Sequence, residues 1–536
     1  MSTLRVQDLS LSIRAVQILE NVSFEVGPGE ILGIVGESGS GKSMTALSIL
    51  NLLPRHSQLS GSVTLGGLEL SGLSDRAMNA VRGDDIGMIF QEPMTALNPL
   101  KTIGSQVAET AWVHGHAGGR EASRIAREAL DRVGLEAEEF PLIRYPHELS
   151  GGQRQRVGIA MAIALRPRLL IADEPTTALD VTNQAQVLGI LKRLVREDGM
   201  GLILITHDLA VIAEMADRVA VMQSGRVVES GPVREVFRQM RHPYTRKLFS
   251  TSAHVPQRTP RAFERTLLDV QRLERRYAIP KRLPWEPQRY KLALDGVSLN
   301  IAKGESVGLV GESGSGKSTL ARTVLGLETA QGGAVHLEGL PIRGPHGTAF
   351  GTRRETQMVF QDPYGSFNPR HPVGRLVAEP LHLLRNGAPK GADRKALVSL
   401  ALERVGLAAT DADRFIHEFS GGQRQRIAIA RALIVEPTLI VLDEAVSALD
   451  VSIRAQVLDL LAALSERLGV SYLFISHDLH VVRAVTDRVY VLRQGKIVES
   501  GPTAKVFTHP EHDYTRTLIA AAPRLDAALK SRFGDA

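Results

Sequence analysis

The sequence predicts an α/β protein made of two tandem modules, each built around a mainly parallel sheet. The glycine-rich segment GESGSGKS occurs at residues 36–43 and again at 311–318, each time after a short apolar run. Five later residues of the first half recur in the second half at a constant spacing of 270 positions. These pairs are Gln91 and Gln361, Ser150 and Ser420, Asp173 and Asp443, His207 and His477, and Tyr244 and Tyr514. The chain therefore contains one module twice.

Length and composition fit two globular domains. The chain has 536 residues, of which 43% are apolar and 23% are charged, and each half is long enough to bury its own core. The longest apolar run, Val157–Leu165, has nine residues, whereas a membrane-spanning helix needs about 20. The amino terminus lacks the basic start and apolar stretch of a secretory signal. We therefore expect a cytoplasmic protein without a transmembrane segment, whose membrane role depends on partners.

Cysteine is absent from the sequence. This excludes disulfides, thiolate zinc sites and cysteine-ligated iron–sulfur clusters.

The positive charge is concentrated in one segment. Residues 252–291 contain ten Lys or Arg and four Asp or Glu, which equals the net charge of +6 of the whole chain. The remainder is balanced, which argues against a nucleic-acid-binding face spread over the folded domains. The segment is either a solvated linker, which the sequence favours, or a contact to anionic lipid or RNA.

The first module begins with alternating apolar segments and continues with a fully apolar one. Leu4–Ile13 and Ile18–Val26 alternate, which predicts strands of an antiparallel sheet. Ile31–Val35 is continuously apolar and leads into the first glycine-rich segment, as a buried parallel strand does.

The rest of the module combines helices with further buried strands. Residues from about 100 to 165 are rich in Glu, Ala, Arg and Leu, which favours helix. Leu169–Ala172 and Leu202–Ile205 predict two buried strands, each followed by polar residues. In open α/β sheets ligands bind at this carboxyl edge.

The second module repeats this order from about Leu267. We predict a first domain over residues 1–250, a linker over 251–266 and a second domain over 267–536. Prolines interrupt the region between the modules, which argues against a long charged connecting helix. They are Pro256, Pro260, Pro280, Pro284 and Pro287.

Each glycine-rich segment fits the phosphate-binding pattern G-x-x-x-x-G-K-S between a strand and a helix. Glycines allow successive backbone N–H groups to converge on a phosphate at a helix amino terminus. We expect Lys42 and Lys317 to reach the β- and γ-phosphates, and the hydroxyls of Ser43 and Ser318 to ligate Mg²⁺. The glycines of the cradles are Gly36, Gly39, Gly41, Gly311, Gly314 and Gly316.

A carboxylate pair ends an apolar run in each half, in LLIADEP and LIVLDEA. We expect Asp173 and Asp443 to hold Mg²⁺ through water. Glu174 and Glu444 are the candidates for the general base that polarises the attacking water. The alternative is a structural pair that caps the next element.

Histidine and glutamine complete the candidate site. A histidine after a strand is more often structural than catalytic. However, His207 and His477 lie at the same spacing of 34 positions from Asp173 and Asp443, which favours a γ-phosphate contact that orients the water. Gln91 and Gln361 follow short apolar strands, where they can sense Mg²⁺ or the water while the next segment reports to a partner.

The segments LSGGQRQR and FSGGQRQR, at residues 149–156 and 419–426, are the most distinctive repeats. Ser150 predicts a helix N-cap, followed by an apolar stripe at helical spacing. The Ser-Gly-Gly start is then a second anion-ready helix terminus. Because one nucleotide does not need two cradles on one module, we expect this cradle to grip nucleotide held by another module.

With these motifs in this order, both halves resemble the nucleotide-binding domains of ABC ATPases. The resemblance implies two domains that close head to tail on two ATP molecules, here supplied by one chain. It implies one site from Lys42, Ser43, Gln91, Asp173, Glu174 and His207 with Ser420, Gly422 and Gln423 opposite. The other site is implied to use Lys317, Ser318, Gln361, Asp443, Glu444 and His477 with Ser150, Gly152 and Gln153. Asp180 and Asp450 match the loop that couples the sites.

Within this group, FQEPMTALNP, FQDPYGSFNP, HPYTRKL and HDYTRTL resemble the oligopeptide/dipeptide (and nickel) importer ATPases, most closely those with two fused domains. The resemblance implies uptake of short peptides or peptide-like solutes, driven by ATP with Mg²⁺. It also implies a peripheral position at the cytoplasmic face of the inner membrane, under two transmembrane permease subunits fed by an extracytoplasmic solute-binding protein. The cargo stays open among peptides, glutathione-like molecules, peptide antibiotics and nickel chelates.

Three departures from the family pattern distinguish the halves. Ala445-Val446 stands where the first half has Pro175-Thr176, and Phe419 replaces a leucine; neither removes a catalytic group. The family stacks adenine on an early aromatic residue. Aligning Leu268–Tyr277 with Leu4–Ile13 places Tyr277 there in the second half and Ile13 in the first. Loss of ring stacking costs about 1 kcal/mol, so our hypothesis is weaker ATP binding at the first site.

Two other functions are less consistent with the sequence. A soluble twin-ABC protein that acts on ribosomes or DNA is the alternative, but the relatives that depend on zinc or iron–sulfur cysteines are excluded. The prolines between the modules argue against the translation-factor type. A regulator that binds ATP without turnover conflicts with Glu174 and Glu444.

Overall fold

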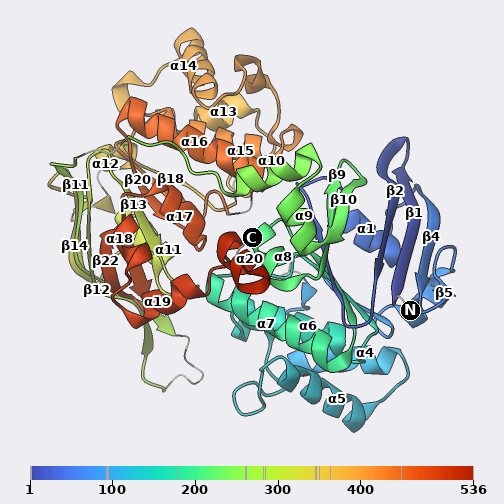
Figure 1. Cartoon of the computed structure of the whole chain (residues 1–536). Coiled ribbons are helices and arrows are strands. Elements are labelled where there is room, and N and C mark those ends of the chain that lie inside the picture. The colour runs from blue at the N-terminus through green and yellow to red at the C-terminus, as the bar shows by residue number, and fades with distance from the viewer. Residues whose placement is uncertain are drawn as a thin grey trace. The chain divides into compact units, whose positions relative to one another are not determined.

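The chain divides into two units, each built around its own sheets (Figure 1). The computed structural model describes residues 3–534 except 92–95, 178, 260–261, 280, 282, 284, 345–346, 349, 363 and 448. Unit 1 comprises Met1–Ala253, Asp450–Ser452 and Pro523–Ala536, and unit 2 comprises His254–Leu449 and Ile453–Ala522.

Unit 1 contains the two expected sheets. The antiparallel sheet has the order β2-β1-β4-β5, and the central sheet has the order β10-β9-β3-β8-β7-β6. In the central sheet β9, β3, β8, β7 and β6 are parallel, and β10 joins the edge antiparallel. The strands are β1 Leu4–Ile13, β2 Val16–Val26, β3 Ile31–Val35, β4 Ser57–Leu65, β5 Leu68–Glu69, β6 Ile86–Ile89, β7 Leu169–Asp173, β8 Gly201–Ile205, β9 Arg218–Gln223 and β10 Arg226–Pro232.

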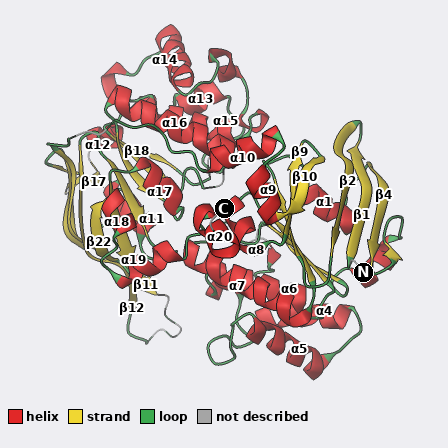
Figure 2. Ribbon diagram, viewed as in Figure 1, coloured by secondary structure: helices red, strands yellow, loops and turns green. Residues whose placement is uncertain are grey.

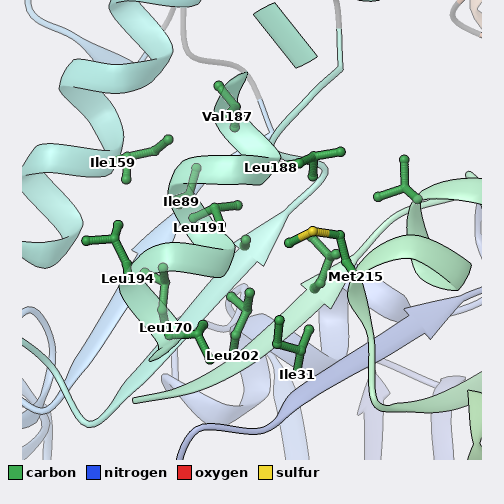
Figure 3. Packing of buried hydrophobic residues seen from close by; sticks show 14 of the residues in the cluster. Ile31, Ile89, Ile159, Leu170, Val187, Leu188, Leu191, Leu194, Leu202 and Met215 are labelled. Atoms are coloured by element: carbon green, nitrogen blue, oxygen red, sulfur yellow. The ribbon is translucent and has the colours of Figure 1, made fainter. Parts of the chain in front are cut away.

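Helices cover the central sheet of unit 1, and α4, α5 and α6 form the expected helical region (Figure 2). Figure 3 shows the core beneath them, where Ile31, Leu170 and Leu202 of the sheet face Leu191 and Leu194 of α7. All five residues of β3, β7 and β8 are buried, which explains their continuous apolar sequence. The helices are α1 Lys42–Ile49, α2 Asp75–Val81, α4 Ile103–Val113, α5 Gly119–Arg132, η1 Pro146–Glu148, α6 Gly151–Ile163, α7 Val181–Asp198, α8 Leu209–Met215, α9 Val233–Gln239 and α10 Pro243–Ser252.

Unit 2 repeats both sheets, in the orders β12-β11-β14-β15 and β18-β19-β20-β13-β21-β22. Its strands are β11 Thr266–Ile279, β12 Arg289–Ala302, β13 Ser306–Val310, β14 Gly332–Leu337, β15 Leu340–Pro341, β16 Arg343–Gly344, β17 Gly347–Thr348, β18 Thr356–Val359, β19 Leu439–Asp443, β20 Ser471–Ile475, β21 Arg488–Arg493 and β22 Lys496–Pro502. Its helices are α11 Lys317–Val324, α12 Phe350–Glu355, α13 Val373–Val377, η2 Glu379–Gly387, α14 Gly391–Arg404, η3 Ala409–Asp413, η4 Ile416–Glu418, α15 Gly421–Leu433, α16 Val451–Leu468, α17 Leu479–Val485, α18 Thr503–Thr508 and α19 Asp513–Ala520. The predicted duplication of an α/β module is therefore present.

The predicted linker starts within unit 1, where α10 ends at Ser252, and belongs to unit 2 from His254 onward. His254 contacts Asp459 at 2.8 Å, and Arg258 forms an ion pair with Asp487 at 2.9 Å. The described residues between His254 and Arg265 contain no helix. Of the prolines named for this region, Pro260, Pro280 and Pro284 lie outside the described residues.

The C-terminal boundary differs from the prediction of a second domain over 267–536. Helix α20 (Leu525–Phe533) packs on α8 within unit 1. Arg532 donates to the carbonyl oxygens of Ala213 (3.2 Å) and Ala216 (2.5 Å), and Leu525 packs against the unit 1 core. These contacts place the residues from Pro523 onward in unit 1.

Candidate functional site

The glycine-rich segments at residues 36–43 and 311–318, called the phosphate loops below, each connect a buried strand to the amino terminus of a helix. Gly41, the N-cap of α1, has a left-handed backbone (φ 100°), and a Cβ there would lie 2.6 Å from Cδ2 of Leu19. Only glycine tolerates both conditions. Lys42 donates from Nζ to the carbonyl oxygens of Gly36 (2.7 Å) and Glu37 (2.9 Å). In unit 2, Lys317 makes the same bonds to Gly311 (2.7 Å) and Glu312 (2.9 Å), so both ammonium groups lie across their loops.

A tyrosine from the carboxyl-terminal part of each module holds the start of the phosphate loop. The backbone N–H of Glu37 donates to the hydroxyl of Tyr244 at 3.0 Å, and that of Glu312 donates to Tyr514 at 2.9 Å. Sequence comparison paired the two tyrosines without giving them a role. Their recurrence in HPYTRKL and HDYTRTL was the available signal, but their partner lies more than 200 residues earlier in the chain.

The first carboxylate of each pair lies beside the loop serine. Asp173 ends β7, and burial together with the neighbouring Glu174 raises its pKa, against the opposing effects of a hydrogen bond from Ser43 and the charge of Lys42. Burial and Glu444 likewise raise the pKa of Asp443. Among the described residues, Oδ1 of Asp173 is buried without a hydrogen-bond partner. A buried oxygen of this kind next to a hydroxyl fits the oxygen ligands that Mg²⁺ prefers.

Protein groups alone do not form a metal cluster at this position. The part of the chain that the structure describes contains no group of three or more His, Cys, Asp or Glu residues suited to a metal ion.

Glu174 and Glu444 have strained backbones. Their φ angles are 47° and 50°, in the left-handed region that non-glycine residues rarely adopt. Each backbone N–H donates to the end of the neighbouring strand, to the carbonyl oxygens of Ile205 (2.9 Å) and Ile475 (2.8 Å). Strain maintained by such contacts is typical of functional sites. No sequence pattern predicted it.

Residues from three separate segments meet at the Glu174 carboxylate. Gln91 donates to it at 3.0 Å and Thr177 at 2.8 Å, and Nδ1 of His207 lies 3.2 Å away. Burial alone would raise the pKa of Glu174, but the hydrogen bonds from His207, Thr177 and Gln91 outweigh it and lower the pKa to about 2. The carboxylate is therefore a weak base in this arrangement.

The second half brings the equivalent residues together. Gln361 donates to Glu444 at 2.6 Å, and Nδ1 of His477 lies 3.2 Å from the same carboxylate. The hydroxyl of Ser447, which stands where the first half has Thr177, donates to the backbone carbonyl of Glu444 instead. The candidate bases, histidines and glutamines thus assemble twice.

Ser150 and Ser420 cap their helices, as the sequence predicted for Ser150. The Ser150 N–H donates to Oε1 of Gln153 (2.8 Å), and the Gln153 N–H donates to the Ser150 hydroxyl (3.3 Å). Ser420 and Gln423 form the same reciprocal box. A Cβ on Gly152 would lie 2.3 Å from Oδ1 of Asn183, so close approach of α7 requires glycine there. Gly422 is crowded in the same way by α16.

The two halves differ in one hydrogen bond made by the helices that follow these caps, α6 and α15. In unit 1, Gln155 donates to the carbonyl oxygen of Pro175 at 2.7 Å. In unit 2, where Ala445 replaces Pro175, Nε2 of Gln425 is buried without a hydrogen-bond partner among the described residues. The buried hydrogen bond of Gln155 in unit 1 thus has no counterpart at Gln425 among the described residues.

Tyr277 lies beside the first turn of α11, next to the phosphate loop. Its hydroxyl donates to Glu328 at 2.5 Å and lies 3.3 Å from the hydroxyl of Thr319, while the Arg275 guanidinium lies 4.6 Å from the ring centre. The Arg275 Nε also contacts Glu328 at 3.1 Å. This polar group fixes the position of the ring.

The corresponding positions of unit 1 are apolar. Left-handed residues Asp8 and Arg272 interrupt β1 and β11 at equivalent places, which supports the alignment of Ile13 with Tyr277. At the same spacings, Leu11, Met44 and Leu53 replace Arg275, Thr319 and Glu328. Leu11 is buried, and Ile13, Met44 and Leu53 pack against the unit 1 core.

Family models match both halves of the chain. The model described as ABC transporter matches residues 19–177 and 294–447. The model described as oligopeptide/dipeptide transporter, C-terminal region, matches residues 228–274 and 498–534.

Curated relatives are similar over nearly the full length. The peptidoglycan transport ATP-binding protein YejF of Agrobacterium fabrum is 46% identical over 98% of this chain and 97% of its own. The glutathione import ATP-binding protein GsiA of Escherichia coli K12 is 45% identical over 97% of this chain and 90% of its own. A solved dimeric ATP-binding cassette, MJ0796 bound to ADP and Pi, aligns with 43% of this chain and 98% of its own at 31% identity, with a TM-score of 0.39. The chain belongs to the ABC transporter family of ATPases, with two ABC domains and the oligopeptide/dipeptide transporter C-terminal region in one polypeptide.

Proposed function

We propose that this chain is the ATP-hydrolysing subunit of an importer for short peptides or peptide-like solutes. The observation that supports it most is the double assembly of Lys42, Asp173, Glu174, His207 and Gln91 and their counterparts around two phosphate loops. The C-terminal family match and the names of the glutathione and peptidoglycan relatives support the solute class.

The proposed reaction starts when nucleotide replaces the contacts that now close each site. The loop N–H groups and the Lys42 ammonium donate to the triphosphate. Lys42 then no longer donates to the carbonyl oxygens of Gly36 and Glu37. Bound Mg²⁺ would neutralise phosphate charge, with Ser43, Gln91 and Asp173 in one site and Ser318, Gln361 and Asp443 in the other as its protein ligands.

Glu174 then acts as the base. Gln91 would hold bound Mg²⁺ and His207 would contact the γ-phosphate, and loss of their hydrogen bonds to Glu174 would remove effects that lower the Glu174 pKa. The carboxylate becomes able to accept the water proton, while His207 orients the water. Following the family resemblance, we assign Ser420, Gly422 and Gln423 to the nucleotide bound by Lys42, and Ser150, Gly152 and Gln153 to the one bound by Lys317.

The proposed partners are two permease subunits and an extracytoplasmic solute-binding protein, with this chain peripheral at the cytoplasmic face of the membrane. No helix among the described residues combines the length and apolarity needed to cross a bilayer. We assign the translocation pathway to the permeases.

Co-purification of the tagged chain from its native cells in gentle detergent, followed by mass spectrometry, tests this proposal. We expect two multi-spanning permease subunits to accompany the chain. Ribosomal proteins or nucleic acid in their place would favour the soluble twin-ABC alternative.

A further inference from the structure

Unit 2 contains an insertion that unit 1 lacks. Asp8 and Arg272 mark equivalent points, since each is left-handed and each donates its N–H to a serine hydroxyl of the next strand. Beyond them, Ile13 pairs with Val16 across two residues, whereas Tyr277 pairs with Lys291 across thirteen. We call the described residues between 278 and 290 the ribbon extension.

The ribbon extension lies beyond the rest of its sheet. The last pair between β11 and β14 joins Glu274 to Gly332, whereas β11 and β12 stay paired as far as Ile279 and Arg289. Past Glu274 the two strands thus pair only with each other within the described sheet. A two-stranded ribbon of this kind buries little apolar surface.

Large apolar side chains of the ribbon extension face solvent. Trp285 is 78% exposed, Tyr290 60%, Leu283 44% and Ile279 42%. None of these four belongs to a core cluster of the described residues. An exposed group of this kind indicates an interaction surface.

Positive charge without an ion-pair partner among the described residues lies in the ribbon extension and at the adjacent Lys291. Arg258, Arg275 and Arg276 of the basic region form ion pairs with Asp487, Glu328 and Glu274. By contrast, the exposed Lys281, Arg289 and Lys291 form no ion pair within the described part of the chain. From residue 278 to 291 the sequence has four Lys or Arg and one acid, Glu286.

We propose that the ribbon extension docks on the anionic surface of a lipid bilayer. Trp and Tyr rings favour the headgroup level of a membrane, aliphatic side chains enter the boundary beneath it, and Lys and Arg attract anionic lipid. RNA would use the basic and aromatic side chains but would leave Ile279 and Leu283 exposed to water. This contact goes beyond the proposed function, because it gives the ATPase a membrane attachment of its own.

Tryptophan fluorescence of the full chain tests the proposal. The sequence contains two tryptophans, so Trp112→Phe leaves Trp285 as the sole reporter. On titration with phosphatidylglycerol vesicles we expect a blue shift of its emission and co-sedimentation of the chain. Phosphatidylcholine vesicles or high salt should weaken both signals. The matched variant Trp285→Phe leaves Trp112, which is 67% exposed on α4, and its emission should not shift.

Removal of positive charge from the ribbon extension and Lys291 is the second test of the proposal. Changing Lys281, Arg289 and Lys291 together to Gln should reduce vesicle binding about 100-fold, given the attraction expected per basic side chain. The same change at the exposed Arg120, Arg238 and Lys247 of unit 1 removes an equal amount of charge, and this control variant should retain most of its vesicle binding. Equal losses in both triple variants, no binding to either vesicle, or tighter binding of polyuridine through the same residues would each overturn the proposal. Permease co-purification is measured separately, so failure of the importer assignment can be distinguished from failure of the membrane-docking proposal.

Discussion

We predict that the two nucleotide sites bind ATP with unequal affinity. Lys42→Ala leaves only the second site with an intact phosphate loop, and Lys317→Ala leaves only the first. The second site offers the Tyr277 ring, which Arg275 and Glu328 hold in place, whereas the first offers Ile13. An aromatic stack contributes about 1 kcal/mol beyond the area buried, which corresponds to about a fivefold difference in Kd.

Equilibrium binding to the two variants measures this difference. The Glu174→Gln and Glu444→Gln changes are added to both proteins so that ATP is not consumed. Inorganic tripolyphosphate is the control ligand, because it has no base and should bind both sites alike. Equal ATP affinities in the two variants would refute the reasoning.

A gain of binding at the first site gives an independent check. Ile13→Phe should tighten ATP binding to the Lys317→Ala protein without changing tripolyphosphate binding. Phenylalanine is the better choice than tyrosine because Met44 and Leu53, which replace Thr319 and Glu328, offer no partner to a phenol hydroxyl.

Three further predictions concern the base and the helix behind it. Glu174→Gln or Glu444→Gln should each lower turnover strongly while ATP binding persists, since a general base contributes about 10²–10⁴-fold; wild-type turnover in the double variant would remove the assigned role. Because the Glu174 pKa falls from 4.5 to about 2 on folding, its ionised form stabilises the fold above pH 4.5 by about 3 kcal/mol, and this stabilisation is lost as the pH falls towards 2. Acid unfolding of Glu174→Gln should accordingly show a shallower pH dependence over that window, and an unchanged slope would count against the hydrogen-bond network. Gln155→Leu should destabilise unit 1 by about 1–3 kcal/mol because the carbonyl of Pro175 loses its donor. Gln425→Leu removes a buried Nε2 that has no partner among the described residues and should be neutral or stabilising; equal shifts in unfolding midpoint would contradict this.

Much of the fold was readable from local sequence. Ile31–Val35 is buried on both faces of a parallel sheet, and such a strand has to be apolar at every position. Gly41 and Ser150 occupy the starts of helices, where a left-handed turn and a side-chain cap limit the choice of residue. The repeat spacing then showed that both halves share these elements.

Tertiary structure decided the features that depend on residues far apart in the chain. The Tyr244 contact to Glu37, the strained backbone of Glu174 held by Ile205, and the docking of α20 on unit 1 each join separate segments. Sequence periodicity records which face of an element is buried, but it contains no information about which distant group meets that face. The sequence by itself therefore determined the two phosphate-binding modules, their candidate residues and the Tyr277–Ile13 difference, whereas only the packed structure determined how each carboxylate is restrained and which residues hold the Tyr277 ring.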